Sequence, residues 1–302
     1  MTATTDIVEI AAGDLALALA PAIGGSLAYF RRRQVDLLRP TSAADLASRN
    51  VLGAAGYPML PYCGRVAERT FDFGGRTYRL ADNFAGHPHS IHGNGWQRPW
   101  RVVRREPAAC ILGLAQSAPD ADWPFAYSAS QIFALDESGF TFEIALRNDA
   151  AEPAPVGLGF HPFFRKTPRT EIAVTAAAIW ENDARMVPAR KSAIPPRFDF
   201  RTRRGIAGID IDNGFSGWDG KAEIVWPEFG ARLRIAADAD LPNVVIYAPA
   251  DGDFVCVEPA SMVADGFNKL AQGETETGVR TLAPGEIFAA RIRFDIEAWE
   301  SA

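Results

Sequence analysis

Hydrophobic and polar residues alternate with a period of two along several segments of the chain. In residues 140–147 (FTFEIALR), phenylalanine, isoleucine and leucine fall on one face, and threonine, glutamate and arginine fall on the other. Residues 231–235 (ARLRI) and 290–296 (ARIRFDI) alternate in the same way. A period of two is typical of a β-strand that buries one face. The pattern therefore predicts half-buried strands in all three segments.

Turn-forming residues divide the chain into many short elements. The 302 residues include 26 glycines and 21 prolines, and the segments 136–139 (DESG) and 227–230 (PEFG) each separate two predicted strands, as hairpin turns do. Only residues 42–48 (SAADLAS) and 266–273 (GFNKLAQG) have a helical pattern, and both are short. Because strands do not alternate with long helices, a doubly wound parallel sheet is not expected. The sequence predicts an all-β fold, a large antiparallel β-sandwich, in which residues 1–302 form a single domain.

Charge and apolar segments argue against several classes of partner. With 37 acidic and 31 basic residues, the net charge is −6, which argues against a nucleic-acid binder and gives no basis for binding an anionic membrane. The most apolar window, residues 15–30, is interrupted by Pro21, Gly24 and Gly25 and is too short to span a bilayer. Residues 1–14 have no basic start followed by an apolar run, so we expect no signal peptide and a cytoplasmic protein.

Three of the four histidines lie within residues 87–96 (HPHSIHGNGW). His87 and His89 would share a face of an extended segment, and His92 would face away. A His-x-His metal site of the cupin type needs a glutamate a few residues later, but residues 90–95 contain no carboxylate. The three cysteines are widely spaced and show no zinc pattern. We therefore expect no metal, and we expect His87 and His89 to have loop or surface roles and to tolerate substitution better than His92.

Two histidines have surroundings that suit chemistry on a sugar. His92 precedes a glycine-rich turn that ends at Trp96; an imidazole can hydrogen-bond a hydroxyl, and an indole can cover the apolar face of a sugar ring. His161 lies among phenylalanines in GLGFHPFFR. Apolar surroundings lower the pKa of a histidine and a nearby carboxylate raises it, so in either case His161 is a candidate proton donor near neutral pH. The alternative is a core histidine that bonds to the backbone.

Glu258 is the candidate carboxylate. It ends the apolar strand predicted at residues 254–257, and alternation places Phe254, Cys256 and Glu258 on one face. A charge at the end of a buried strand is costly unless it is paired or hydrogen-bonded. A function would explain why the cost is tolerated, and so would a salt bridge at the strand end.

Three further polar residues are candidates for binding a substrate. Arg65 lies in a loop rich in proline and glycine before the next predicted strand, where its guanidinium could hold two neighbouring hydroxyls or a carboxylate. Arg69 could do the same, and a surface salt bridge is the alternative for both. Asp212 heads a predicted turn rich in glycine and aromatic residues, which an Asx-turn would also explain. Motifs typical of nucleotide binding or of serine hydrolases do not occur in the sequence.

Five segments occur in an order and spacing that resemble the aldose 1-epimerase (galactose mutarotase-like) family. They are residues 64–80 (GRVAERTFDFGGRTYRL), 89–100 (HSIHGNGWQRPW), 157–164 (GLGFHPFF), 212–220 (DNGFSGWDG) and 256–268 (CVEPASMVADGFN). The similarity extends from about residue 20 to residue 295. The resemblance implies a large β-sandwich, the galactose mutarotase-like supersandwich, and an enzyme that interconverts the α and β anomers of a small free sugar, an aldose, without a cofactor.

The resemblance also implies a role for each candidate residue. Glu258 corresponds to the general base of the family, His161 to its general acid and His92 to the second histidine of its site. Arg65 corresponds to the arginine of an Asn-Arg pair, and Asp212 to an aspartate that holds the substrate. The tryptophans that could stack on the sugar are Trp96 and Trp218.

Departures from the family pattern leave the identity of the sugar open. Gly64 stands where the family has the asparagine before the arginine, and Asn94 replaces the second glycine of the family's His-Gly-Gly. An alignment with a shorter gap would choose Arg69 instead of Arg65. Two alternative functions are an epimerase of a phosphorylated or sulfonated hexose and a non-catalytic carbohydrate-binding protein on the same fold. The modified hexose would favour several arginines near the site, for which the candidates are Arg65, Arg69, Arg98 and Arg165.

Overall fold

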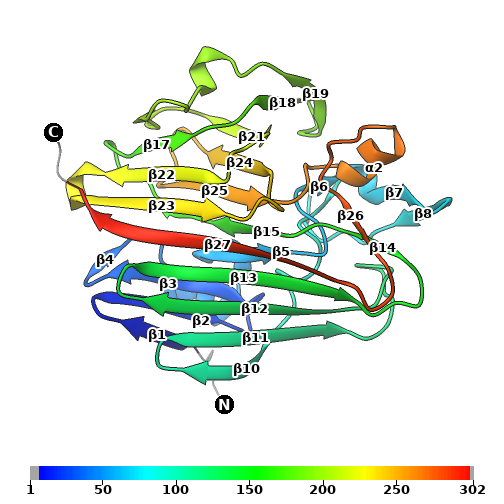
Figure 1. Ribbon diagram of the computed structural model, residues 1–302, viewed down its shortest axis with the longest axis horizontal. Coiled ribbons are helices and arrows are strands. Elements are labelled where there is room, and N and C mark those ends of the chain that lie inside the picture. The colour runs from blue at the N-terminus through cyan, green and yellow to red at the C-terminus, as the bar shows by residue number, and fades with distance from the viewer. Residues whose placement is uncertain (1–6, 300–302) are drawn as a thin grey trace.

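Two large antiparallel sheets lie face to face in the protein (Figure 1). The computed structural model describes residues 7–299. Residues 1–6 and 300–302 lie outside the described residues. They include the start of the segment for which we expect no signal peptide, and both ends of the predicted domain 1–302. The predicted all-β class and the large antiparallel sandwich are confirmed.

Within residues 7–299, the first sheet has twelve strands. Neighbours run in the order β1-β2-β3-β5-β15-β25-β24-β21-β18-β19, with β4 beside β3 and β16 beside β25. The bounds are β1 (Val8–Ala12), β2 (Leu15–Ala20), β3 (Ser26–Arg32), β4 (Val35–Asp36), β5 (Gly56–Met59), β15 (Gly159–Pro162), β16 (Phe164–Arg165), β18 (Ala178–Asn182), β19 (Pro188–Ser192), β21 (Ile211–Ser216), β24 (Asn243–Ala248) and β25 (Phe254–Ala260).

The second sheet has nine strands in the described part of the chain, in the order β10-β11-β12-β13-β27-β23-β22-β17-β20. The bounds are β10 (Arg101–Glu106), β11 (Ala109–Gln116), β12 (Tyr127–Asp136), β13 (Gly139–Asn148), β17 (Glu171–Val174), β20 (Arg204–Gly205), β22 (Lys221–Trp226), β23 (Ala231–Ala237) and β27 (Ile287–Ala298). Short pairs join β6 (Arg65–Val66) to β9 (Ser90–Ile91), β7 (Thr70–Phe73) to β8 (Arg76–Arg79), and β14 (Ala154–Val156) to β26 (Arg280–Leu282). The helices are α1 (Ala43–Ser48), α2 (Gly266–Ala271) and the 3₁₀ turns η1 (Val51–Gly53), η2 (Ala67–Arg69), η3 (Pro196–Phe198) and η4 (Pro227–Phe229).

Both predicted hairpin turns and both predicted short helices are confirmed. Asp136 ends β12 and pairs with Gly139, the first residue of β13. The Asp136 carboxylate accepts hydrogen bonds from the N–H groups of Ser138 (2.8 Å) and Gly139 (3.1 Å). Between β22 and β23, the turn ends at Gly230, whose φ of +57° lies in the left-handed region that glycine adopts without a steric cost. The residues that punctuate the sequence therefore set the ends of these strands.

The hydrophobic core lies between the two sheets. The apolar residues of the alternating segments 140–147, 231–235 and 290–296 are buried there, as predicted. The ring of Phe142 on β13 lies 4.4 Å from the ring of Phe160 on β15, measured between ring centres. Because β13 and β15 belong to different sheets, this contact joins the two layers of the sandwich.

Strand β25 separates this core from the opposite face of the first sheet. Val255 and Val257 belong to the core. Cys256, between them, points to the other face, where it joins a second cluster whose other buried members are Tyr57, Trp96 and Phe163. The predicted alternation along residues 254–258 is thus confirmed, and it gives the first sheet two apolar faces.

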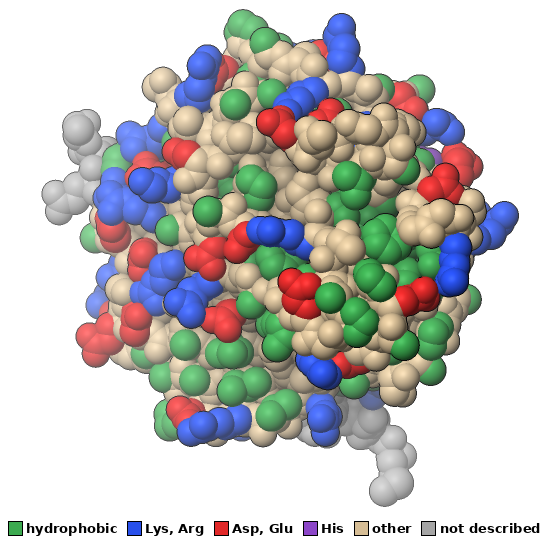
Figure 2. Space-filling model, turned by 45° about the vertical axis from the view of Figure 1, so that its right-hand side comes forward, with side chains coloured by type: hydrophobic (Ala, Val, Ile, Leu, Met, Phe, Trp, Pro, Cys, Tyr) green, Lys and Arg blue, Asp and Glu red, His purple; other side chains and the backbone are tan. Residues whose placement is uncertain are grey.

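The polar residues of the alternating segments form ion pairs on the second sheet. Arg291 lies 2.9 Å from Glu143, and Arg234 lies 3.2 Å from Glu223. Acidic and basic side chains are interspersed on the face of the molecule that Figure 2 shows. Among residues 7–299, no helix is both long and apolar enough to cross a membrane.

Replacing Phe142 with alanine should destabilise the protein by about 3–5 kcal/mol, because it removes a ring that joins the sheets and leaves a cavity in the core. Urea unfolding followed by tryptophan fluorescence measures the loss. Thr141, which precedes Phe142 and points to the opposite face, provides the control: Thr141→Ala should change the free energy of unfolding by less than about 1 kcal/mol. Equal losses in the two variants would contradict this placement of the core.

Candidate active site

A cavity of about 350 Å³ lies on the face of the first sheet that points away from the core. Side chains from β5, β15, β21, β24 and β25 line it, together with loop residues. Of the site residues predicted from the sequence, those that line the cavity are Arg65, His92, Trp96, His161, Asp212 and Glu258.

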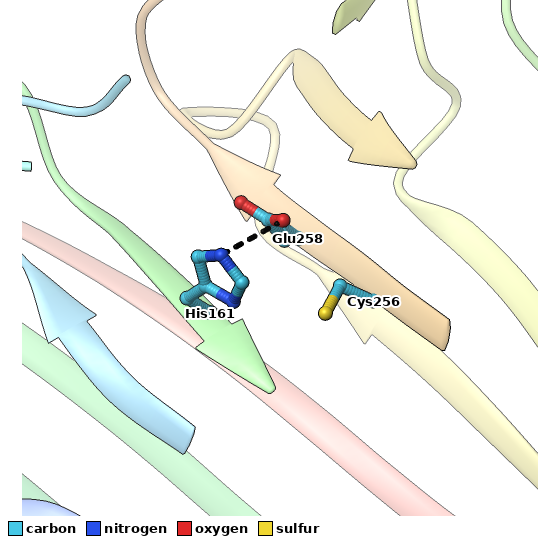
Figure 3. A group of neighbouring side chains, drawn as sticks. All are labelled: His161, Cys256 and Glu258. Atoms are coloured by element: carbon cyan, nitrogen blue, oxygen red, sulfur yellow. Dashed lines mark ion pairs between the residues drawn. The ribbon is translucent and has the colours of Figure 1, made fainter. Parts of the chain in front are cut away.

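Neighbouring strands of the first sheet bring His161 and Glu258 together (Figure 3). β15 and β25 pair through Gly159 and Ala260. Gly159 is two residues before His161, and Ala260 is two residues after Glu258. Nε2 of His161 lies 3.2 Å from Oε1 of Glu258, and only 6% and 2% of the two residues are exposed. The sequence predicts that the strand ends at Glu258. This is wrong, because β24 pairs with β25 as far as Ala260.

Burial shifts the pKa values of this pair in opposite directions. It raises the pKa of Glu258 well above its usual value, and the carboxylate of Asp212 adds to the rise. It lowers the pKa of His161 to about 3, and the positive charge of Arg39 also contributes. Desolvation disfavours the charged form of each group. Between the two pKa values the pair therefore holds one proton, and burial favours its position on Glu258.

His92 is held as a hydrogen-bond donor at the cavity. Its Nδ1 accepts a hydrogen bond from the backbone N–H of Gly64 (3.1 Å). Burial lowers the pKa of His92 well below its usual value, so the ring is neutral and carries its proton on Nε2. The backbone has a φ of +58° at His92, and a Cβ on the next residue, Gly93, would lie 2.1 Å from the carbonyl oxygen of Leu60. The glycine after His92 therefore allows this loop to pack closely.

Arg65 and Asp212 form an ion pair at the cavity. Nη2 of Arg65 lies 3.0 Å from Oδ2 of Asp212. The sequence predicts that Asp212 heads a turn. This is wrong, because the residue lies inside β21, which pairs with β24 along its length. Arg69 pairs instead with Asp82 (3.1 Å) and does not line the cavity. Of the two candidate arginines, Arg65 is therefore the one at the cavity.

The order of these residues along the chain agrees with the resemblance found in the sequence. The family model for aldose 1-epimerases matches residues 6–295. The chain belongs to the aldose 1-epimerase family. Membership of this family implies a sugar as the substrate.

Similar proteins from Escherichia coli and Lactobacillus match nearly the whole chain. The uncharacterized protein YphB of Escherichia coli K12 is 29% identical over 283 residues, which are 91% of this chain and 93% of YphB. A crystal structure of a candidate aldose 1-epimerase from Escherichia coli K12 has a TM-score of 0.89 and 26% identity, covering 97% of this chain and 99% of the other. The galactose 1-epimerase of Lactobacillus acidophilus NCFM has a TM-score of 0.79 and covers 99% of this chain and 97% of its own. At 19% identity, this last match shows a common fold.

The two tryptophans predicted to stack on a sugar lie in different places in this aldose 1-epimerase family member. Trp96 lines the cavity, but it is only 1% exposed; its Nε1–H donates to the carbonyl oxygen of Gly93 (2.9 Å), and its ring packs on Tyr57. Trp218 belongs to the core between the sheets, does not line the cavity, and donates to the carbonyl oxygen of Lys221 (2.7 Å). The structure therefore does not support a substrate contact for Trp218.

His89 lies in a loop, as one of its two predicted roles requires, but it is a buried structural residue, which corrects the surface alternative. It is fully buried. Its Nδ1 accepts from the backbone N–H of Glu68 (3.0 Å), so its Nε2–H donates to the carbonyl oxygen of Arg185 (3.1 Å). His89 thereby joins the 3₁₀ turn η2 to the loop between β18 and β19. His87 is half-buried and does not line the cavity.

One group of three side chains among residues 7–299 has the spacing of potential metal ligands. The donor atoms of His161, Cys256 and Glu258 lie within 4.8 Å of one another (Figure 3). Imidazole, thiolate and carboxylate groups suit Zn²⁺. Burial raises the pKa of Cys256 well above its usual value, so the thiol keeps its proton at neutral pH, which opposes metal binding. The three histidines of residues 87–92 do not form such a group.

Two residues that shape the cavity are missed by the sequence reasoning. Tyr57 on β5 packs its ring against that of His161, with 4.7 Å between ring centres. Arg39 lines the cavity from the segment that follows β4. Neither residue belongs to a recognisable motif. The one available signal was that Arg39 directly follows two leucines, Leu37 and Leu38, which are both buried.

Substituting His89 with alanine should destabilise the protein by about 1–3 kcal/mol, because it removes a fully buried ring together with its hydrogen bonds to η2 and to the β18–β19 loop. Thermal and urea unfolding measure the change. His87→Ala is the matched control, and we expect a change below about 0.5 kcal/mol. A His89 variant as stable as the His87 variant would show that these hydrogen bonds do not support the fold.

Proposed function

We propose that this protein is an aldose 1-epimerase (mutarotase), which interconverts the α and β anomers of an aldose by acid–base catalysis. The buried pair of His161 and Glu258 at the cavity supports this proposal most directly. Opening a cyclic hemiacetal requires that one proton leaves the C1 hydroxyl and that another reaches the ring oxygen. Both oxygens are bonded to C1, so an acid and a base that lie side by side can serve them together.

In the proposed reaction, Glu258 is the base and His161 is the acid. The Glu258 carboxylate takes the proton of the C1 hydroxyl while protonated His161 gives a proton to the ring oxygen, the bond between C1 and the ring oxygen breaks, and C1 becomes an aldehyde. After rotation about the C1–C2 bond, the ring oxygen attacks the other face of the aldehyde. Glu258 then returns its proton to the aldehyde oxygen, and His161 takes one back. The pair holds one proton at every stage, the number that burial favours.

The other polar residues of the cavity position the sugar. His92 offers its Nε2–H to a sugar oxygen, because Nδ1 is already occupied by Gly64. Arg65 and Asp212 offer donors and acceptors to neighbouring hydroxyls. Fixing the sugar in this way holds C1 and the ring oxygen against the catalytic pair.

A non-catalytic sugar-binding protein is the alternative on the same fold. Sugar binding by itself would not require two ionisable groups that are nearly completely buried against each other, because their desolvation opposes folding. Acid–base catalysis does require such a pair. The catalytic function therefore explains more of the cavity.

Glu258→Gln should lower the rate constant for mutarotation by about 10²–10⁴-fold, because the amide cannot accept the C1 proton. His161→Asn should also slow the reaction. Polarimetry, or NMR exchange between anomers, on a panel of free aldoses measures these rates, and circular dichroism checks that each variant is folded. His87→Ala, outside the cavity, is the control. Wild-type rates in the Glu258 variant would sink the assignment.

The pH dependence should follow the shifted pKa values. With ordinary pKa values, the base would require a pH above about 4 and the acid a pH below about 6.5, and the rate would fall as pH rises through that value. In this cavity both groups are protonated only when the pH lies below the pKa of His161, about 3. Both are deprotonated only when the pH lies above the raised pKa of Glu258. Between these two pKa values the pair holds one proton. We expect kcat/KM to stay level as pH rises through about 6.5. A ten-fold fall across that pH would contradict the one-proton pair.

A further inference from the structure

Arg39 presents a second cation to the cavity and is held firmly in place. Its backbone N–H donates to the carbonyl oxygen of Phe163 (2.8 Å). Its guanidinium lies over the rings of Phe163 and Phe254, with Cζ 4.2 Å and 4.8 Å from the ring centres, which is cation–π contact. Nη2 donates to the carbonyl oxygens of Leu52 and Ala54, both at 3.0 Å. These contacts fix the guanidinium without neutralising its charge.

The charges at the cavity do not cancel. Arg65 is paired with Asp212, and the pair of His161 and Glu258 is neutral overall when it holds one proton. Arg39, by contrast, has no carboxylate within 4.0 Å in residues 7–299, and its Nε and Nη1 have no acceptor there. The cavity wall therefore carries one net positive charge, with free N–H donors.

Asp45 is an acidic side chain on which Arg39 acts: the charge of Arg39 contributes, after the hydrogen bonds of Ser42 and Asn50, to lowering the pKa of Asp45. This carboxylate accepts hydrogen bonds from Asn50 (2.7 Å) and from Ser42 (2.5 Å). Asp45 is half-buried and does not line the cavity. Asp45 makes no ion pair with Arg39 and its hydrogen bonds go to Ser42 and Asn50, and water partly screens a charge in such a position, so Asp45 does not compensate Arg39 at the cavity.

The position of Arg39 relative to the catalytic pair indicates which part of a sugar it would meet. The ring of Phe163 stacks on His161, with 4.5 Å between ring centres, and the same ring contacts Arg39. Arg39 thus lies one ring away from the group that would protonate the ring oxygen. In a hexopyranose the ring oxygen is bonded to C5, and C5 carries C6. With the ring oxygen at His161, as in the proposed reaction, C6 is the exocyclic carbon on the ring-oxygen side of the sugar that lies away from C1.

We propose that the physiological substrate is an acidic hexose whose anionic group on C6 binds to Arg39. The group is the carboxylate of a hexuronate or the phosphate of a hexose 6-phosphate. This inference rests on the proposed mutarotase function and adds the substrate class to it. Guanidinium groups form strong charge-assisted hydrogen bonds to both kinds of oxyanion.

The test compares mutarotation rates on neutral and acidic sugars. Glucuronate and galacturonate represent the carboxylates, glucose 6-phosphate represents the phosphate, and glucose and galactose are the neutral references. We expect kcat/KM for one of the acidic classes to exceed that for the neutral sugars by about 10- to 100-fold. Which acidic class shows the preference identifies the anion. The preference should weaken as salt concentration rises, because salt screens the charge.

Variants of Arg39 separate the charge from the rest of the cavity. Arg39→Gln should remove most of the preference for the acidic sugar, Arg39→Lys should keep part of it, and Arg69→Gln, an arginine outside the cavity, should leave it unchanged. Calorimetry of acidic and neutral sugars with Glu258→Gln, alone and combined with Arg39→Gln, gives the same comparison for binding without turnover. Thermal unfolding verifies that each variant is folded. If Arg39→Gln does not fold, the loss of preference for the acidic sugar is measured with Arg39→Lys instead.

Two results would overturn the inference, and they differ from each other. If the neutral sugars are accelerated at least as well as every acidic one, or if Arg39→Gln slows both classes equally, the mutarotase proposal stands and the acidic substrate is wrong. If no sugar of the panel is accelerated, the mutarotase proposal itself falls, and the acidic substrate falls with it.

Discussion

Burying a carboxyl group and an imidazole against each other costs desolvation energy, which the fold has to offset elsewhere. The cost is concentrated at His161 and Glu258, which emerge from adjacent strands and leave almost no surface to solvent. The same strand that carries Glu258 places Val255 and Val257 in the core between the sheets. The period of two along β25 therefore links stability to chemistry: one face anchors the strand, and the other presents the carboxyl group at a fixed height beside the imidazole.

The loops around the cavity depend on close backbone packing. Gly64 has a φ of +68°, and a Cβ there would lie 2.6 Å from that of Ala264, so no asparagine fits without movement. Its N–H instead orients His92. The departure from the family pattern at this position thus has a structural reason: the loop packs so closely against Ala264 that it leaves no room for a side chain at residue 64.

Much of the fold could be predicted from local patterns in the sequence, because the alternation of a strand and the residue preferences of a turn each involve only a few neighbouring residues. The strands at 140–147 and 290–296 and the turns at 136–139 and 227–230 are of this kind. The failures concern partners that are far apart in the chain. Whether His89 is exposed depends on Arg185, and whether Asp212 begins a turn depends on a strand 35 residues later. No window of the sequence contains these pairings; only the family resemblance, which spans the chain, brought the distant site residues together.

The positive charge of Arg39 gives the cavity a further property, through its effect on His161. The charge helps to lower the pKa of His161, and so opposes the protonated imidazole that the ring oxygen requires. A neutral sugar would leave this opposition in place. An anion bound at Arg39 would cancel it, because opposite charges in a low-dielectric site interact strongly. The substrate group that Arg39 binds would thereby shift the shared proton from Glu258 toward His161, which is the arrangement from which ring opening begins. Recognition of the anion and activation of the acid would then be two results of one electrostatic interaction.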